Sequence, residues 1–229
     1  MTTFPASSAS PELVALIGAN LARVHERIAA SGRDPSLVRV VAVTKTFGVD
    51  AVRGAAAVGL AAVGENYVGE LCDKRDAARD VDVAWYFLGA LQSNKLTRVL
   101  HCADVLCSVA RVKELVRIAR ERPGSPLYVQ VDFTGASLRH GAAPDEVEAL
   151  VARGRELGLD VRGLMTIASP DPEAARVAFR GVATLADDLG LVERSMGMSD
   201  DLEIACEFAT TEVRIGRALF GPRSVAQAP

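Results

Sequence analysis

Metal-binding residues are few in this sequence, and those present are scattered. The 229 residues include four cysteines and three histidines, with no CxxC pair and no histidine cluster. Structural and catalytic metals are held by such side chains at characteristic short spacings. We therefore expect no metal site, and we expect the cysteines to be buried, reduced thiols.

Long apolar runs are missing as well. No run approaches the roughly 20 apolar residues that cross a bilayer, and residues 1–10 lack the basic-then-apolar layout of a secretory signal. The formal net charge of −3 argues against nucleic acid or an anionic membrane as the main partner. We expect a cytoplasmic protein with neither kind of partner.

After an amphipathic stretch at 11–30, the chain repeats one pattern of apolar run, small-residue loop and amphipathic stretch. Helical spacing of apolar residues predicts helices, and continuous apolar runs are typical of parallel strands covered on both faces. The predicted strands are 39–44, 61–64, 84–89, 105–109, 127–132, 161–167, 195–198 and 211–215. The predicted helices between them are 50–58, 67–78, 93–102, 111–122, 144–157, 172–189 and 200–208.

Eight strands alternating with helices in 229 residues favour a closed barrel over an open doubly wound sheet. We predict an α/β fold, a single (β/α)8 TIM barrel with an extra N-terminal helix. No linker-like stretch divides the chain, so we expect a leader at 1–9, one domain at 10–223 and a tail at 224–229.

Lys45 follows the first predicted strand, at the end of a barrel where ligands bind. Partial burial there disfavours the ammonium form of a lysine, and a neutral amine can hold an aldehyde as a Schiff base. A lysine whose charged end reaches solvent from a strand end fits the same position. Position alone leaves both interpretations open.

The loops after the last two predicted strands form a candidate phosphate site. Barrels commonly bind phosphate between these loops, which here carry Ser195, Ser199, Gly216 and Arg217. Serine hydroxyls can donate, a glycine lets the backbone approach a ligand, and the start of the next helix favours an anion. Two ordinary glycine turns would give the same pattern.

Six motifs in order resemble those of the YggS/PROSC family of pyridoxal phosphate homeostasis proteins. They are VTK at 43–45, GENYVGE at 64–70, WYFLGALQSNK at 85–95, VRGLMTI at 161–167, SMGMSDD at 195–201, and VRIG at 213–216 with FGPR at 220–223. Together they run through nearly the whole chain, so the resemblance is specific.

The resemblance implies a fold like the N-terminal barrel of alanine racemase, with pyridoxal 5′-phosphate as a Schiff base on Lys45. Asn66 would lie beside the cofactor and Arg214 would face the pyridine nitrogen, while the serines and residues 216–217 would take the phosphate. The residues expected to bind the cofactor are Lys45, Asn66, Met165, Ser195, Ser199, Arg214, Gly216 and Arg217. The resemblance also implies a role in intracellular vitamin B6 homeostasis; we expect a monomer whose partners include pyridoxal-phosphate-dependent apo-enzymes.

Two positions depart from the family pattern. Tyr86 stands where the family usually has histidine, and Arg217 where it usually has threonine. A threonine hydroxyl to the phosphate would be lost at 217, although the backbone donor would remain. The arginine side chain could replace that hydroxyl with charge or point to solvent.

The expected role is to bind the cofactor rather than to run a reaction with it. An arginine facing the pyridine nitrogen keeps that nitrogen unprotonated and weakens the ring as an electron sink. Racemase-like proteins take a second acid/base, a tyrosine, from a C-terminal β-domain, for which we expect no room because the sequence ends six residues after Arg223. Tyr128 is expected at the wrong end of the barrel, while Tyr67 and Tyr86 stay open.

Two alternatives remain open at this point. One is a small pyridoxal-phosphate-dependent amino-acid racemase or another enzyme that uses this cofactor. The other is an aldolase-like barrel whose lysine forms an imine with a sugar phosphate.

Overall fold

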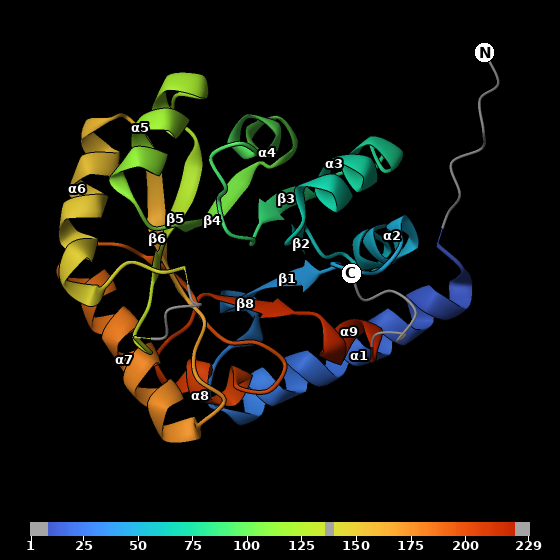
Figure 1. Cartoon of the computed structure of the whole chain (residues 1–229). Helices are drawn as coiled ribbons and strands as arrows, with labels where there is room; N and C mark the ends of the chain where they lie inside the picture. Colours follow the sequence, from blue (N-terminus) through green and yellow to red (C-terminus); the bar gives the residue numbers. More distant parts are fainter. Residues whose placement is uncertain (1–8, 136–139, 223–229) are drawn as a thin grey trace, which may run out of the picture.

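The computed structural model describes residues 9–135 and 140–222, and its eight parallel strands close into a barrel (Figure 1). Neighbouring strands follow chain order, and β8 pairs with β1 to complete the ring. The strands are β1 (Arg39–Val43), β2 (Ala62–Glu65), β3 (Ala84–Phe87), β4 (Val105–Val109), β5 (Pro126–Val131), β6 (Asp160–Thr166), β7 (Glu193–Ser195) and β8 (Glu212–Ile215). The predicted barrel is confirmed.

Helices cover the outside of the barrel (Figure 1). They are α1 (Pro11–Ala30), α2 (Val49–Ala57), α3 (Val68–Ala77), α4 (Leu96–Cys102), α5 (Val112–Glu121), α6 (Val147–Glu156), α7 (Pro172–Asp188), α8 (Leu202–Glu207) and α9 (Arg217–Phe220), with 3-10 turns η1 (Pro35–Leu37) and η2 (Pro144–Glu146). The predicted leader (1–9) and tail (224–229) lie outside the described residues, apart from residue 9.

The extra N-terminal helix, α1, begins and ends where the sequence indicates. The Ser10 hydroxyl accepts a hydrogen bond from the Leu13 amide at 3.2 Å and so satisfies one of the first free donors of the helix. Its buried residues recur at helical spacing: Ile17, Leu21, Val24 and Ile28. This face packs against α2, α8 and α9, so α1 closes the outer layer beside the seam between β8 and β1.

Both faces of the strands are buried, which explains their continuous apolar runs. In β1, Val40 and Ala42 belong to the layer beneath the helices, while Val41 belongs to the barrel interior. Seven buried residues fill that interior: Val41, Ala62, Tyr86, Val105, Cys107, Tyr128 and Met165. The barrel interior is therefore a packed core, and in barrels of this kind ligands bind at the C-terminal end of the strands.

The seventh strand differs from its predicted position. We predicted 195–198, but β7 runs from Glu193 to Ser195. Two backbone hydrogen bonds to β8 follow it, from the Met196 amide to Glu212 and from the Arg214 amide to Gly197, both 3.0 Å. Gly197 has a φ of +97°, a left-handed conformation that ends the extended run and that glycine adopts readily. Residues 196–199 consequently form a loop at the C-terminal end of the barrel.

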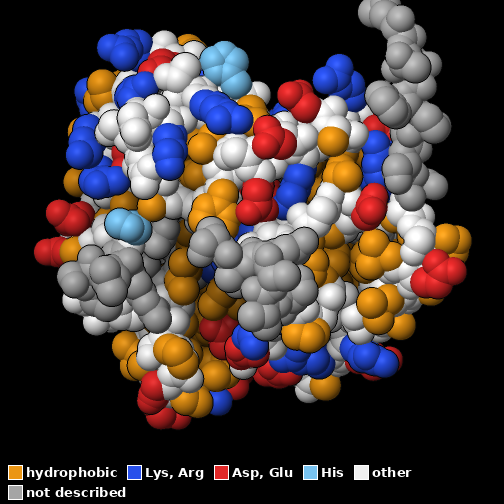
Figure 2. Space-filling model, turned by 45° about the vertical axis from the view of Figure 1, so that its right-hand side comes forward, with side chains coloured by type: hydrophobic (Ala, Val, Ile, Leu, Met, Phe, Trp, Pro, Cys, Tyr) orange, Lys and Arg blue, Asp and Glu red, His pale blue; other side chains and the backbone are white. Residues whose placement is uncertain are grey.

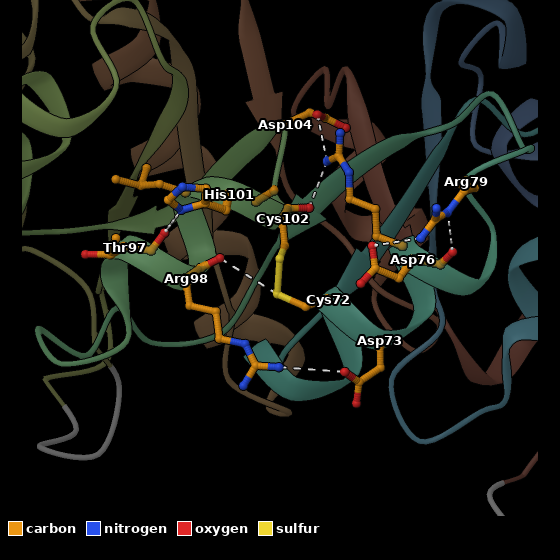
Figure 3. The surroundings of a disulfide bond; sticks show 12 residues. Cys72, Asp73, Asp76, Arg79, Thr97, Arg98, His101, Cys102 and Asp104 are labelled. Atoms are coloured by element: carbon orange, nitrogen blue, oxygen red, sulfur yellow. Dashed lines mark hydrogen bonds and ion pairs between the residues drawn. A yellow bond between two sulfur atoms is a disulfide. The ribbon is translucent and has the colours of Figure 1, made fainter.

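The prediction that all four cysteines are reduced is wrong. Cys72 of α3 and Cys102 of α4 form a disulfide, with their Cα atoms 5.2 Å apart (Figure 3). The two helices pack side by side, which brings together residues that are 30 positions apart in sequence. Cys107 and Cys206 are buried free thiols, as predicted.

Within residues 9–135 and 140–222, no three histidine, cysteine or acidic side chains are placed to hold a metal ion. No helix in that same part of the chain is long and apolar enough to cross a membrane. On the face drawn in Figure 2, acidic and basic side chains are interspersed with apolar ones.

Candidate functional site

A cavity of about 230 Å³ lies at the C-terminal ends of the strands. Its wall combines apolar side chains with a lysine, an arginine pair, an amide and a hydroxyl. The lining residues are Val43, Lys45, Asn66, Leu88, Met165, Ile167, Met198, Ser199, Asp200, Arg214, Gly216 and Arg217. They come from β1, β6 and β8 or from loops that follow six of the strands, which is where ligands bind in barrels of this kind.

Seven of the eight predicted site residues line this cavity, and Ser195 does not. Lys45 lies two residues after Val43, the last residue of β1, and is partly buried. The sequence reasoning did not single out the apolar wall formed by Val43, Leu88 and Ile167. Those residues carried no chemical signal of their own, because apolar residues near strand ends are common.

Ser195 lies beneath the cavity and contacts Arg214. Its hydroxyl donates to Glu212 at 2.7 Å and accepts from the Arg214 guanidinium at 2.8 Å. Arg214 also donates to the carbonyls of Ser195 and Thr166, at 2.6 and 2.7 Å. Burial lowers the pKa of Arg214 from its usual value, although Glu212 opposes that shift. These three acceptors hold the guanidinium in one orientation at the floor of the cavity.

A second polar cluster occupies the opposite, N-terminal end of the barrel and is joined to Ser195 through the Glu212 carboxylate. Arg39, the first residue of β1, donates to Glu193 and Glu212, both at 3.1 Å, and to the Tyr86 hydroxyl at 3.3 Å. The Tyr128 hydroxyl bonds to both of these carboxylates. The prediction that Tyr128 lies at the wrong end of the barrel is therefore confirmed, and Tyr86 shares that location.

Burial raises the pKa of both Tyr86 and Tyr128 well above the usual value for a phenol, so both stay protonated. Tyr67 is 45% exposed and lines a neighbouring hollow between α3 and α4, together with Lys95. No tyrosine of the described residues lines the cavity that holds Lys45.

The loops after β7 and β8 meet at one side of the cavity. The Ser199 hydroxyl accepts from the Ala218 amide at 3.2 Å, which joins the first loop to α9. The Arg217 side chain forms an ion pair with Asp200, and both are largely exposed. Arg217 therefore brings a partly neutralised charge to the rim. Gly216 packs closely against β1, because a Cβ atom there would lie 3.3 Å from the Val43 carbonyl oxygen.

Asn66 is placed by a close approach between two loop backbones. A Cβ atom added at Gly89 would lie 2.0 Å from the Asn66 carbonyl oxygen, far inside contact distance. The Gly89 carbonyl also accepts a hydrogen bond from Ser108, so the loop cannot easily retreat. Only glycine at position 89 permits this backbone contact, which places Asn66 in the cavity wall.

Gly89→Ala is expected to lower the free energy of unfolding by about 1–3 kcal/mol, because backbone must move to admit the methyl group. The same movement displaces Asn66 and should weaken ligand binding at the cavity. Gly69→Ala is the matched control, since a Cβ there meets nothing within 4 Å in a helix. Chemical denaturation of both variants measures the difference; equal midpoints for the two would contradict this account of Gly89.

Comparison with known proteins identifies the family. Residues 15–224 match the model of the alanine racemase N-terminal domain. A pyridoxal phosphate homeostasis protein of Pseudomonas aeruginosa is 42% identical over 211 residues, covering 88% of this chain and 92% of the relative. The chain belongs to the family of pyridoxal phosphate homeostasis proteins. The resemblance of the six sequence motifs is thus confirmed.

Solved structures of the family and of its fold relatives agree with the barrel. PipY of Synechococcus elongatus, solved with pyridoxal phosphate bound, has a TM-score of 0.75 at 32% identity, covering 86% of this chain and all of PipY. Alanine racemase of Corynebacterium glutamicum has a TM-score of 0.70 at 18% identity, covering 94% of this chain and 63% of the racemase. The racemase comparison shows the shared fold alone.

Proposed function

We propose that this protein binds pyridoxal 5′-phosphate as a Schiff base on Lys45 and holds the cofactor for vitamin B6 homeostasis. The observation that carries the proposal is the cavity itself, which brings together a partly buried lysine and a fixed arginine from the neighbouring strands β1 and β8 at the C-terminal end of the barrel. PipY, a structural relative at 32% identity, was solved with the same cofactor.

The chemistry of the wall fits each part of this ligand. The apolar side chains of Met165, Leu88 and Ile167 suit the faces of an aromatic ring, and Asn66 offers an amide beside it. We assign Arg214 to the pyridine nitrogen, and Ser199 with the backbone of Gly216 and Arg217 to the phosphate. When bound, the cofactor supplies a reactive aldehyde and an electron-poor ring.

Ser195 has a supporting place in this proposal. The family resemblance put it with the phosphate, yet its hydroxyl is engaged by Glu212 and Arg214 beneath the cavity. We propose that Ser195 contributes by orienting the Arg214 guanidinium, whose fixed charge in turn keeps the pyridine nitrogen unprotonated.

Borohydride trapping tests the proposed binding mode. Purified apo-protein mixed with pyridoxal 5′-phosphate should turn yellow, and borohydride should bleach it while fixing the cofactor to the chain. Peptide mass mapping should then place the modification on the peptide that contains Lys45. A protein that stays colourless and unmodified at saturating cofactor would refute the proposal, and an imine formed only with a sugar phosphate would favour the aldolase-like alternative.

We propose a binding role rather than catalysis because, among the described residues, no tyrosine lines the cavity with Lys45, and the carboxylate that does, Asp200, is paired with Arg217. Tyr86 and Tyr128 are held at the far end of the barrel, and the names of the curated relatives state no reaction. The loaded protein should therefore show little turnover of L- or D-alanine and other amino acids. Turnover of about 1 s⁻¹ or faster, an ordinary enzyme rate, would favour the racemase alternative.

We further propose that the loaded protein delivers its cofactor to pyridoxal-phosphate-dependent apo-enzymes and works as a monomer in the cytoplasm. Faster activation of an apo-enzyme by the loaded protein than by an equal amount of free cofactor would support delivery. Light scattering of the purified protein tests the monomer, and cell fractionation tests the compartment.

A further inference from the structure

A buried ion cluster lies directly behind the loop that carries Lys45. Lys74 of α3 is only 8% exposed, and its ammonium group donates to three acceptors. These are the Thr44 carbonyl at 2.8 Å, the Glu65 carboxylate at 2.7 Å and the Glu70 carboxylate at 2.8 Å. A lysine has three N–H donors, so all of them are used here.

The cluster holds the chain on both sides of Lys45. On one side, Lys74 binds the Thr44 carbonyl, and the Thr44 hydroxyl donates to Glu65 at 2.6 Å. On the other side, the Thr46 amide donates to Glu70 at 2.8 Å. The peptide units that flank Lys45 are therefore fixed to one helix by charged groups, which make stronger hydrogen bonds than neutral groups do.

The backbone at Thr46 needs such support. Its φ is +67°, a left-handed conformation that β-branched residues rarely adopt. Strained backbone of this kind persists where surrounding contacts fix it, and it is concentrated at functional sites. Glu70, which accepts from the Thr46 amide, is the observed charged contact at that position.

The three charges depend on one another. Burial raises the pKa of Glu65, although the Lys74 ammonium opposes that shift. Burial also acts to raise the pKa of Glu70, but hydrogen bonds from Lys74 and the Thr46 amide outweigh it, and that pKa lies below its usual value. Removing the ammonium group would therefore disturb both carboxylates and, through them, residues 44 and 46.

We propose that Lys74, acting through Glu65 and Glu70, is a positioning residue that directs the Lys45 amine into the cavity for capture of the aldehyde. This inference rests on the proposed function. It assigns a role to a second lysine that touches no ligand: Lys74 is held as a buried cation, while Lys45 lines the cavity.

Comparison of two ligands distinguishes a loss of Lys45 positioning from a general disruption of the binding site. Pyridoxal 5′-phosphate can form an imine, whereas pyridoxine 5′-phosphate has an alcohol in place of the aldehyde and cannot. In the full-length chain, Lys74→Met should raise the apparent Kd for pyridoxal 5′-phosphate about tenfold, the equivalent of one lost charged hydrogen bond. The Kd for pyridoxine 5′-phosphate should stay within about twofold of the wild-type value.

The matched control is Lys113→Met, which removes an exposed lysine from α5 and should change neither affinity. If Lys74→Met fails to fold, Glu70→Ala gives the same test, because it frees the Thr46 amide while Lys74 keeps Glu65 as a partner. Glu70→Ala should likewise weaken the binding of pyridoxal 5′-phosphate but not the binding of pyridoxine 5′-phosphate.

Equal losses for both ligands, or wild-type affinity for both, would overturn the positioning role. These outcomes are distinct from failure of the proposed function, which would show as a wild-type chain that forms no adduct. Slower borohydride trapping of Lys74→Met at saturating cofactor, with wild-type trapping in Lys113→Met, would support the role independently of affinity.

Discussion

Replacing Lys45 by alanine is expected to abolish the covalent adduct with pyridoxal 5′-phosphate completely. Among the described residues, Lys45 is the only lysine that lines the cavity at the end of the barrel. The nearby Lys74 cannot substitute for it, because its ammonium group is buried and bound by two carboxylates and a carbonyl. An amine that is buried with all three N–H donors engaged cannot reach the aldehyde as a nucleophile.

The measurement is the yellow imine absorbance together with the mass of the borohydride-treated chain. Weak binding should survive in Lys45→Ala, because the groups assigned to the ring and phosphate remain. Lys95→Ala is the stringent control, since Lys95 lines the adjacent hollow and should leave the adduct intact. A borohydride-stable adduct in Lys45→Ala would place the Schiff base on another lysine.

The barrel could be predicted from the sequence because its buried strands appear there as continuous apolar runs. Strands covered on both faces must be apolar throughout, and β4 was predicted with its observed bounds, Val105–Val109. The seventh strand was the exception. It has only three residues, and the apolar methionines that follow it resemble a strand, although the left-handed Gly197 turns the chain away.

Most of the site was predictable because the fold dictates where strand ends meet. Once eight strands close into a barrel, residues at and just after the strand ends converge, as Lys45, Asn66 and Arg214 do. The contacts beneath them were not predictable. The place of Ser195 under Arg214 depends on side-chain direction and on the register between β7 and β8, which residue identities alone do not determine.

The Lys74 cluster left a weak signal in the sequence. Glu70 and Lys74 are four residues apart, a spacing that usually forms a modest ion pair on an exposed helix face. Only the position of α3 beside the loop that follows β1 turns that pair inward, toward Thr44 and Thr46. The sequence therefore indicated a pair but not its burial or its neighbours.

The disulfide could not be anticipated for a similar reason. Two cysteines can be bridged only when their Cα atoms lie within about 7 Å, and Cys72 and Cys102 are 30 residues apart. Nothing in the spacing of four unclustered cysteines selects this pair. The general rarity of disulfides in reducing compartments favoured the opposite prediction.

Removing this bond is expected to lower the free energy of unfolding by about 3–4 kcal/mol. A cross-link that closes a loop of 30 residues restricts the unfolded chain, and its stabilising effect grows with the logarithm of loop length. Here the loop spans α3, β3 and α4, so the loss should affect unfolding of the whole barrel. Guanidinium denaturation of wild type and the double variant Cys72→Ser, Cys102→Ser measures it.

A reductant provides the internal control for this prediction. It should shift the wild-type midpoint to that of the double serine variant and leave the variant itself unchanged, because Cys107 and Cys206 are already free thiols. Thiol titration of the unfolded, unreduced wild-type chain should find two of its four cysteines. Four free thiols and a midpoint insensitive to reductant would show that the bond does not form. If the bond forms only on oxidation, the protein in a reducing compartment works as the less stable dithiol form, in which α3 is held by its packing and by the hydrogen bonds of Lys74 and Glu70 to the loop after β1.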